Sequence, residues 1–355
     1  MNLTGEINGK KRSGKIANKE SIIFMDIELL RERASIIQRV RAFFDQRGYL
    51  ETDTPLLAPD LIPESCLEVF NTMRLWPEGS RRPAKPYWLI PSPEIWMKRL
   101  IARHRTNIYQ ICKCFRNGES SGDQHSPEFT MLEYYTMEAG YRDSLKLTEE
   151  LFGFLAGGRD NTVSDDLRPP FIKMTVGEAF ERWAGFDLYR AAVSAEAMVK
   201  EAGRLGLNPM PGLSVPELYD LIFIHSVEPQ IRMNKPVALT DYPAFVPCLA
   251  RKKPDGKTVE RWELYARGTE LANCYSEEIG AEQVRSFFES EKTAKEKNAL
   301  VRHSTDDNYW KMFEPEFSGG SLFPECSGVA LGLDRLIMVL AGKKNLDSVL
   351  PFPME

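Results

Sequence analysis

The chain has 355 residues, of which 43% are apolar and 27% charged, as in ordinary soluble globular proteins. Its 46 basic and 51 acidic residues give a net charge of −5, which argues against a broad nucleic-acid-binding face. No apolar run approaches about 20 residues, so we expect no membrane span, and no apolar signal region begins the chain. The six cysteines have no zinc-type spacing, which indicates free thiols in a reducing cytoplasm.

The pattern of the chain predicts a tail and one large domain. Residues 1–24 are polar and lack periodicity, which predicts a disordered N-terminal tail. We expect residues 25–355 to form a single domain. Within it, about 143–235 has a mostly helical pattern with proline-rich joints, and we interpret this range as an insertion because we find no chemistry in it.

A helix is expected at 27–47, where apolar side chains recur every three or four residues and Gly48 follows. A short strand, 49–55, then ends at Pro55. This helix and strand are compatible with ordinary core packing and also with a dimer surface.

The next helix is expected to begin at Glu94, after a strand at 87–90. Ser92 suits the N-cap position and Pro93 suits the first helical turn. Taken alone, this pattern indicates a plain helix cap. The alternative is that Ser92 and Glu94 form the wall of a site.

Residues 107–135 predict two strands joined by a polar loop. Alternation places Arg116 on the same face as Ile108 and Gln110 in the first strand. In the second strand, Glu133 and Tyr135 share a face. Such charge is unusual in a hairpin that is otherwise apolar enough to be core.

A second acidic group lies in the strand pattern at 259–279. Asn273, Tyr275 and Glu277 share a face, and Glu270 is out of phase with them, so we expect a bulge or turn between. Glu263 and Glu270 flank a glycine turn and can hold Mg²⁺, which takes a few carboxylates plus phosphate oxygens. Each acid alone fits a solvated sheet face paired with Lys or Arg, but the whole set fits that interpretation poorly.

The C-terminal part predicts a charged helix at 282–302, then a strand of small residues at 328–332 and a helix from about Asp334. Gly332 permits close approach to the backbone. Arg335 lies in the first turn of that helix, where a cation is unfavourable with the helix dipole, which suggests an anion nearby.

Together these segments resemble the three motifs of class II aminoacyl-tRNA synthetases. Residues 38–55 resemble motif 1, FRNGESSGDQHSPEFTMLE at 115–133 resembles motif 2, and GVALGLDRLIMVL at 328–340 resembles motif 3. The similarity is closest to lysyl-tRNA synthetases, through SPE at 92–94, EFTMLEYY at 128–135 and ELANCYSE at 270–277. It implies an α+β fold, with an antiparallel sheet flanked by helices, and a homodimer.

Only 26 residues precede the expected motif 1 helix, so we expect no OB-fold anticodon domain. The chain is therefore similar to the free-standing paralogues that ligate lysine to elongation factor P. That family has Ser in the SPE turn and Ala in motif 3, matching Ser92 and Ala330. The resemblance implies activation of lysine, preferably (R)-β-lysine, with ATP and transfer to a lysine side chain of elongation factor P.

The resemblance also assigns roles to residues. Arg116 and Arg335 would contact the phosphates of ATP and act in catalysis, and Glu263 and Glu270 would hold Mg²⁺. The ATP-binding residues would be Arg116, Asn117, Glu119, His125, Phe129, Glu270, Leu271, Gly332 and Arg335. The residues that bind the amino acid would be Ser92, Pro93, Glu94, Glu133, Tyr135, Asn273, Tyr275, Glu277 and Ala330.

The chain departs from its relatives in a few places. The motif 2 loop is one residue longer and lacks the arginine before His125, which leaves Glu119 as the acid expected at adenine; Cys274 replaces a usual Gly, and Tyr275 a usual Phe. Two other functions stay open. One is a truncated lysyl-tRNA synthetase, with tRNA a less favoured acceptor. The other is a non-catalytic paralogue that binds an amino acid or adenylate.

Overall fold

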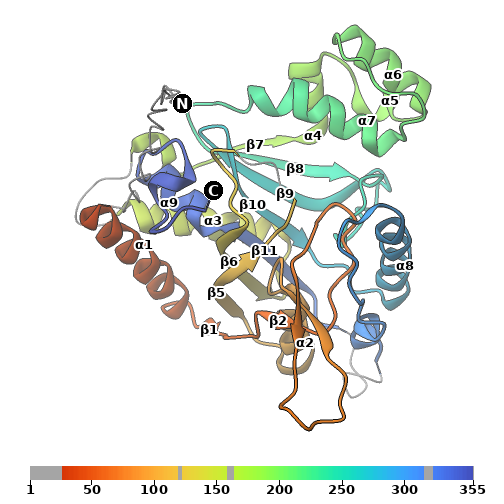
Figure 1. The fold of residues 1–355 in the computed structure, drawn as a ribbon. Coiled ribbons are helices and arrows are strands. Elements are labelled where there is room, and N and C mark those ends of the chain that lie inside the picture. Colours follow the sequence, from red (N-terminus) through yellow and green to blue (C-terminus); the bar gives the residue numbers. More distant parts are fainter. Residues whose placement is uncertain (1–25, 119–121, 158–163, 316–322, 355) are drawn as a thin grey trace, which may run out of the picture.

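The computed structural model describes residues 26–118, 122–157, 164–315 and 323–354. The expected tail lies outside these ranges. An eight-stranded sheet in the order β1-β5-β6-β11-β10-β9-β8-β7 crosses the domain (Figure 1). Neighbouring strands are antiparallel except β1 with β5 and β7 with β8. The strands in chain order are β1 Leu50–Glu51, β5 Ile108–Phe115, β6 Glu128–Met137, β7 Ile172–Thr175, β8 Val237–Pro243, β9 Thr258–Ala266, β10 Thr269–Ser276 and β11 Cys326–Gly332.

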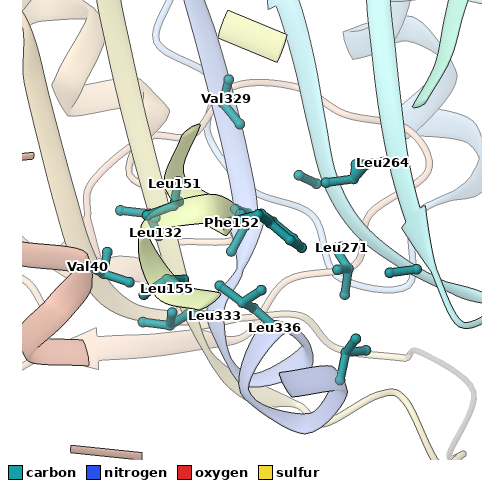
Figure 2. Close-up of a cluster of buried hydrophobic side chains, with 14 of the residues drawn as sticks. Val40, Leu132, Leu151, Phe152, Leu155, Leu264, Leu271, Val329, Leu333 and Leu336 are labelled. Carbon is teal, nitrogen blue, oxygen red and sulfur yellow. The ribbon is translucent and has the colours of Figure 1, made fainter. Parts of the chain in front are cut away.

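Three helices cover one face of this sheet. They are α1 Ile27–Asp45, α3 Tyr141–Ala156 and α9 Leu333–Leu340. Their apolar sides meet Leu132, Leu264 and Val329 of the sheet in one buried cluster (Figure 2). Because side chains alternate along a strand, the residues between these core positions point to the opposite face. The opposite face is where the sequence predicts the site.

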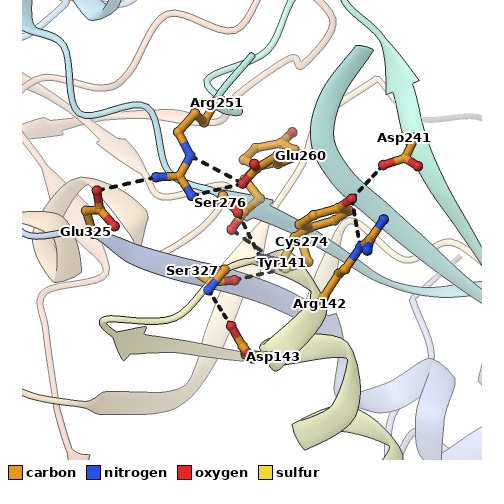
Figure 3. Close-up of polar contacts among 12 residues, drawn as sticks. Tyr141, Arg142, Asp143, Asp241, Arg251, Glu260, Cys274, Ser276, Glu325 and Ser327 are labelled. Atoms are coloured by element: carbon orange, nitrogen blue, oxygen red, sulfur yellow. Dashed lines mark hydrogen bonds and ion pairs between the residues drawn. The ribbon is translucent and has the colours of Figure 1, made fainter. Parts of the chain in front are cut away.

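Polar contacts attach α3 to the sheet (Figure 3). The backbone N–H of Tyr141 donates to Ser276 Oγ at 2.8 Å, and the Tyr141 hydroxyl donates to Asp241 Oδ1 at 2.7 Å. At the same end of the sheet, Arg251 lies between Glu260 and Glu325. The two contacts of Tyr141 satisfy polar groups that the packing of α3 would otherwise bury without partners.

Two helices flank the opposite face. α2 Glu94–His104 and α8 Ala281–Asn298 pack together with the site-facing Tyr135 of β6 in a second cluster. A small sheet in the order β2-β4-β3 lies before α2. Its strands are β2 Leu57–Ala58, β3 Asn71–Arg74 and β4 Lys85–Leu89.

Between β7 and β8 the chain forms a separate group of helices with its own apolar cluster, seen in green in Figure 1. They are α4 Val176–Ala179, α5 Leu188–Ala191, α6 Ala195–Arg204 and α7 Val215–Ile222. The range 143–235, which we expected to be mostly helical, also contains most of α3 and all of β7. α3 packs on the main core and β7 joins the main sheet.

The structure confirms the α+β class, with a mainly antiparallel sheet flanked by helices. The predicted hairpin 107–135 is β5 and β6, and the bulge expected in β10 lies between Glu270 and Ala272. Two local predictions were wrong. Pro93, and not Ser92, is the N-cap of α2, and no side chain caps that helix. The strand expected at 49–55 is paired only at Leu50–Glu51, because beyond it only Thr52 bonds to Tyr109 of β5. No helix in the described part of the chain is long and apolar enough to cross a membrane.

Candidate active site

A row of side chains crosses the face of the sheet opposite α1 and α3. Strand pairing places Gln110 opposite Glu133, Glu133 opposite Ala330, Ala330 opposite Asn273 and Asn273 opposite Glu263. Paired residues in a sheet point to the same face and lie within side-chain contact distance. The register therefore brings five residues, one from each of five strands, into one line. Four of these residues were predicted for the site.

A second row runs beside the first. It pairs Tyr135 with Gly328, Gly328 with Tyr275 and Tyr275 with Arg261. A Cβ atom added to Gly328 would lie 2.4 Å from Glu277 Oε1 and 2.5 Å from Tyr135 Cε1. Only glycine fits there, because Glu277 and Tyr135 close over the backbone. The predicted residues Glu277, Tyr135 and Tyr275 thus meet at this strand.

A cavity of about 160 Å³ lies along the same face toward the loop that joins β5 and β6. It is lined by nine of the predicted residues: Arg116, His125, Phe129, Glu270, Leu271, Asn273, Ala330, Gly332 and Arg335. Asn117 does not line it; its backbone N–H donates to Glu68 O at 2.9 Å. Glu119 lies outside the described residues.

Two arginines face this cavity. Arg335 donates from Nε to Gln124 O at 3.0 Å and from Nη1 to Glu270 O at 3.1 Å, and Nη1 lies 3.9 Å from Glu270 Oε2. The guanidinium carbon of Arg116 lies 5.2 Å from the centroid of the Phe129 ring. Carbonyl oxygens hold Arg335 in place, and the Glu270 carboxylate lies only at the edge of ion-pair distance, so the cavity is suited to an anion.

The residue before Arg335 anchors the start of α9. Asp334 accepts the Thr130 backbone N–H at 2.6 Å and pairs with Arg33 of α1 at 2.5 Å. Asp334 and Arg33 are almost fully buried. This contact connects α1, β6 and α9 at the edge of the cavity.

Glu263 and Glu270 lie near one another but differ in their surroundings. Glu263 accepts hydrogen bonds from Tyr242 at 2.6 Å, Tyr265 at 2.8 Å and Arg261 at 2.5 Å. Glu270 keeps 39% of its side chain exposed, yet its enclosed position and the charge of Glu263 raise its pKa to about 7. A divalent cation between them would remove that repulsion, so these two residues would be able to hold a Mg²⁺ together with phosphate oxygens.

Three carboxylates, Glu94, Glu133 and Glu277, lie at the other end of the rows. Tyr135 donates to Glu133 Oε1 at 2.8 Å, and Glu133 Oε2 has no hydrogen-bond partner among the described residues. Lys98 Nζ lies 2.6 Å from Glu94 Oε1 and 2.7 Å from Glu277 Oε2. Burial raises the pKa of Glu277 to about 7 and that of Glu133 well above its usual range. A buried carboxylate needs a cation or donor, so this cluster is suited to an ammonium ligand.

Comparison with known proteins agrees with this arrangement. A family model for class II tRNA synthetases (D, K and N) matches residues 25–355. The chain belongs to that family.

It is 35% identical over 330 residues to the elongation factor P–(R)-beta-lysine ligase of Avibacterium paragallinarum, an alignment that covers 93% of this chain and 96% of the relative. It is 33% identical over 331 residues to the protein of that name from Haemophilus influenzae (strain PittGG), with 93% and 96% covered. It is 34% identical over 328 residues to that from Proteus mirabilis (strain HI4320), with 92% and 94% covered.

Sequence reasoning missed several members of the site. Lys98 carried a signal, since it stands four residues after Glu94 on a helix, where opposite charges meet. Gln110 shares a strand face with Arg116, and its Nε2 is buried with no partner among the described residues. Glu64 had no such signal; burial, and after it the charge of Glu94, raise its pKa to about 7.

Proposed function

We propose that this chain is an ATP-dependent ligase that activates lysine, as (R)-β-lysine, to an aminoacyl-adenylate and transfers it to a lysine side chain of elongation factor P. One observation carries the proposal: a cavity lined by Arg116 and Arg335 is also lined by Ala330, which pairs in the sheet with Glu133 of the buried carboxylate cluster. A polyanion suits the first part and a diamino acid the second. The names of the relatives support the choice of substrate and acceptor.

In this proposal the cavity takes ATP. Arg116 binds the α-phosphate and Arg335 the γ-phosphate, while the ring of Phe129 stacks on adenine and His125 holds the bent triphosphate. Leu271 and Gly332 line the nucleotide, and Asn117 and Glu119 belong to the adjoining loop. Glu263 and Glu270 hold Mg²⁺, which when bound neutralises phosphate charge.

The carboxylate end takes the amino acid. Glu133, Tyr135 and Glu277 bind the far ammonium, and Glu94 binds the ammonium nearer the carboxyl group. Asn273 and Tyr275 frame the backbone end together with Ser92 and Pro93, and Ala330 narrows the pocket between them. Asn273 Oδ1 is buried with no partner among the described residues, which supports a ligand donor at that position.

The chemistry follows from alignment. A carboxylate oxygen of the amino acid attacks the α-phosphorus, the bond to the β-phosphate oxygen breaks, and pyrophosphate leaves. Because the nucleophile is already ionised, this step needs no general base, and the residues of the site act by positioning and charge stabilisation. In the second step the acceptor amine attacks the carbonyl carbon, the bond to AMP breaks, and the amine loses a proton.

Two further features belong to the proposal. By resemblance, α1 and the strand after it form the interface of a homodimer. The enzyme works in the cytoplasm, where its six cysteines, all free in the structure, stay reduced.

The test measures ATP–pyrophosphate exchange with α-lysine and (R)-β-lysine, then offers elongation factor P and lysine tRNA as acceptors. We expect exchange that is faster with (R)-β-lysine, and label on elongation factor P. Label on tRNA alone would instead identify a lysyl-tRNA synthetase without an anticodon domain. Absence of exchange with any amino acid would identify a non-catalytic binding protein.

A further inference from the structure

Lys98 is a buried cation inside the predicted amino-acid site. It lies in the second turn of α2, and only 2% of its side chain is exposed. Its Nζ contacts two of the three carboxylates at hydrogen-bond distance, Glu94 Oε1 at 2.6 Å and Glu277 Oε2 at 2.7 Å. The protein has therefore placed its own ammonium group where the ligand's ammonium groups would bind.

Lys98 leaves specific acceptors free for a ligand. It contacts Glu277 through Oε2, while Oε1 lies above Gly328 beside Tyr135. Glu133 Oε2, on the neighbouring strand, has no hydrogen-bond partner among the described residues. With all three carboxylates ionised, the cluster carries three negative charges and Lys98 one positive charge, which leaves two negative charges.

We propose that Lys98 is a positioning and specificity residue, a fixed counter-ion that holds Glu94 and Glu277 in place and leaves the site with the charge that a ligand with two ammonium groups matches. This inference rests on the proposed function, because it assumes that these carboxylates bind the amino acid. Lys98 itself touches no reacting atom. Without it, three enclosed carboxylates would repel one another and take up protons instead of binding the ligand.

The pKa values of the cluster predict proton release on ligand binding, which can be measured. The pKa of Glu277 is raised to about 7 by burial, Lys98 acts to lower it, and Glu94 raises it. The pKa of Glu133 is raised by burial and by Glu94, against the hydrogen bond from Tyr135. Tyr309 also faces Lys98. Ligand binding should thus release protons near pH 7, and loss of Lys98 should increase that release.

The first variant is Lys98→Met, with Arg99→Met on the same helix as the matched control. Arg99 is exposed and pairs with Asp306 away from the cluster. We expect Lys98→Met to weaken lysine binding about tenfold or more at pH 7, equivalent to a pKa increase of about one unit, and to recover most of the affinity by pH 9. Calorimetry in two buffers of different ionisation enthalpy measures affinity and proton release together. Arg99→Met should behave as the wild type.

The second variant is Lys98→Ala, assayed with n-propylammonium. We expect the free amine to restore ATP–pyrophosphate exchange in a saturable way, and to raise neither the wild-type nor the Arg99→Met rate. A loss of affinity that is equal at all pH values and is not rescued by the amine would overturn the inference, because it would indicate a packing role only.

The wild-type protein sets the baseline for proton release. Lysine binding at pH 7 that releases as many protons from the wild type as from Lys98→Met would also overturn the inference. These outcomes differ from failure of the proposed function, in which the wild type neither binds nor activates lysine or β-lysine at any pH.

Discussion

The two ends of the site solve opposite electrostatic problems. At the proposed ATP end, Arg335 is held by carbonyl oxygens and keeps 23% of its side chain exposed. At the proposed amino-acid end, Glu277 is only 3% exposed and already has an internal cation. An open end can attract a hydrated polyanion, whereas the charge of buried carboxylates must be partly neutralised before any ligand binds. Substitutions at the two ends should consequently impair different steps: exchange with ATP at one end and lysine binding at the other.

The largest effect is expected at the open end. Arg335→Ala should reduce kcat/KM for ATP–pyrophosphate exchange about 100- to 1000-fold, as when one stabilising donor is lost from a transition state. The affinity for lysine should change little, because Arg335 is remote from the carboxylate cluster. Arg285→Ala, an exposed arginine of α8 paired with Glu289, is the control. An equal loss in the control, or a loss confined to lysine binding, would contradict this division.

Substitutions at two glycines of β11 should distinguish the two ends of the site. Gly328→Ala places a Cβ 2.4 Å from Glu277 Oε1 and should weaken lysine binding roughly 100-fold, about the cost of displacing a buried, paired carboxylate. Gly332→Ala meets nothing nearer than the Arg335 side chain at 3.6 Å, so it should leave lysine binding intact. Separate titrations with lysine and with ATP measure both. If the two variants have the same profile, the two ends are not independent.

The stability of the ligand-free protein should fall as pH rises from about 4.5 to 7. Burial raises the pKa values of Glu64 and Glu277 to about 7, whereas in the unfolded chain they titrate near 4.5. In that window the folded state binds more protons than the unfolded state, so unfolding becomes easier as the pH increases.

We therefore expect a Tm several degrees higher at pH 5.5 than at pH 7.5 without ligands, and a smaller difference with ATP, Mg²⁺ and lysine bound. Glu277→Gln should reduce the difference in the ligand-free protein. A Tm that rises with pH over this window in the wild type would show that these carboxylates are not destabilising when ionised.

The smallest effect is expected at Ala330, which lies between Glu133 and Asn273 in the first row. Ala330→Gly should widen the pocket and shift the preference from (R)-β-lysine toward α-lysine about fivefold or more, since one methylene-sized change is worth about 1–3 kcal/mol. The ratio of kcat/KM values for the two substrates measures it. Ala238→Gly, at a buried position of β8, controls for the general cost of glycine in a strand. An unchanged ratio would remove Ala330 from the specificity of the enzyme.

Local pattern predicted most elements because each has a strong local cause. Alternation located β5 and β6, and the phase error at Glu270 predicted the bulge that the structure has in β10. The N-cap was wrong because Ser92 suits capping only if its side chain turns back toward the helix, and the chain enters α2 through Pro93 instead. Likewise, β7 was missed because four residues in a proline-rich range give too short a pattern to recognise.

The resemblance to the synthetase motifs selected the candidate residues: arginines in two motifs, acids in three, and glycines in β11. It could not assign partners. Lys98 and Glu277 are 2.7 Å apart although their numbers differ greatly, and Glu263 is occupied by three donors from two strands. Those pairings depend on strand register and on how α2 packs over the sheet, which are decided by burial of the whole core. Periodicity within a segment carries no information about them, so only the folded chain shows that Lys98 is paired with two of the three carboxylates.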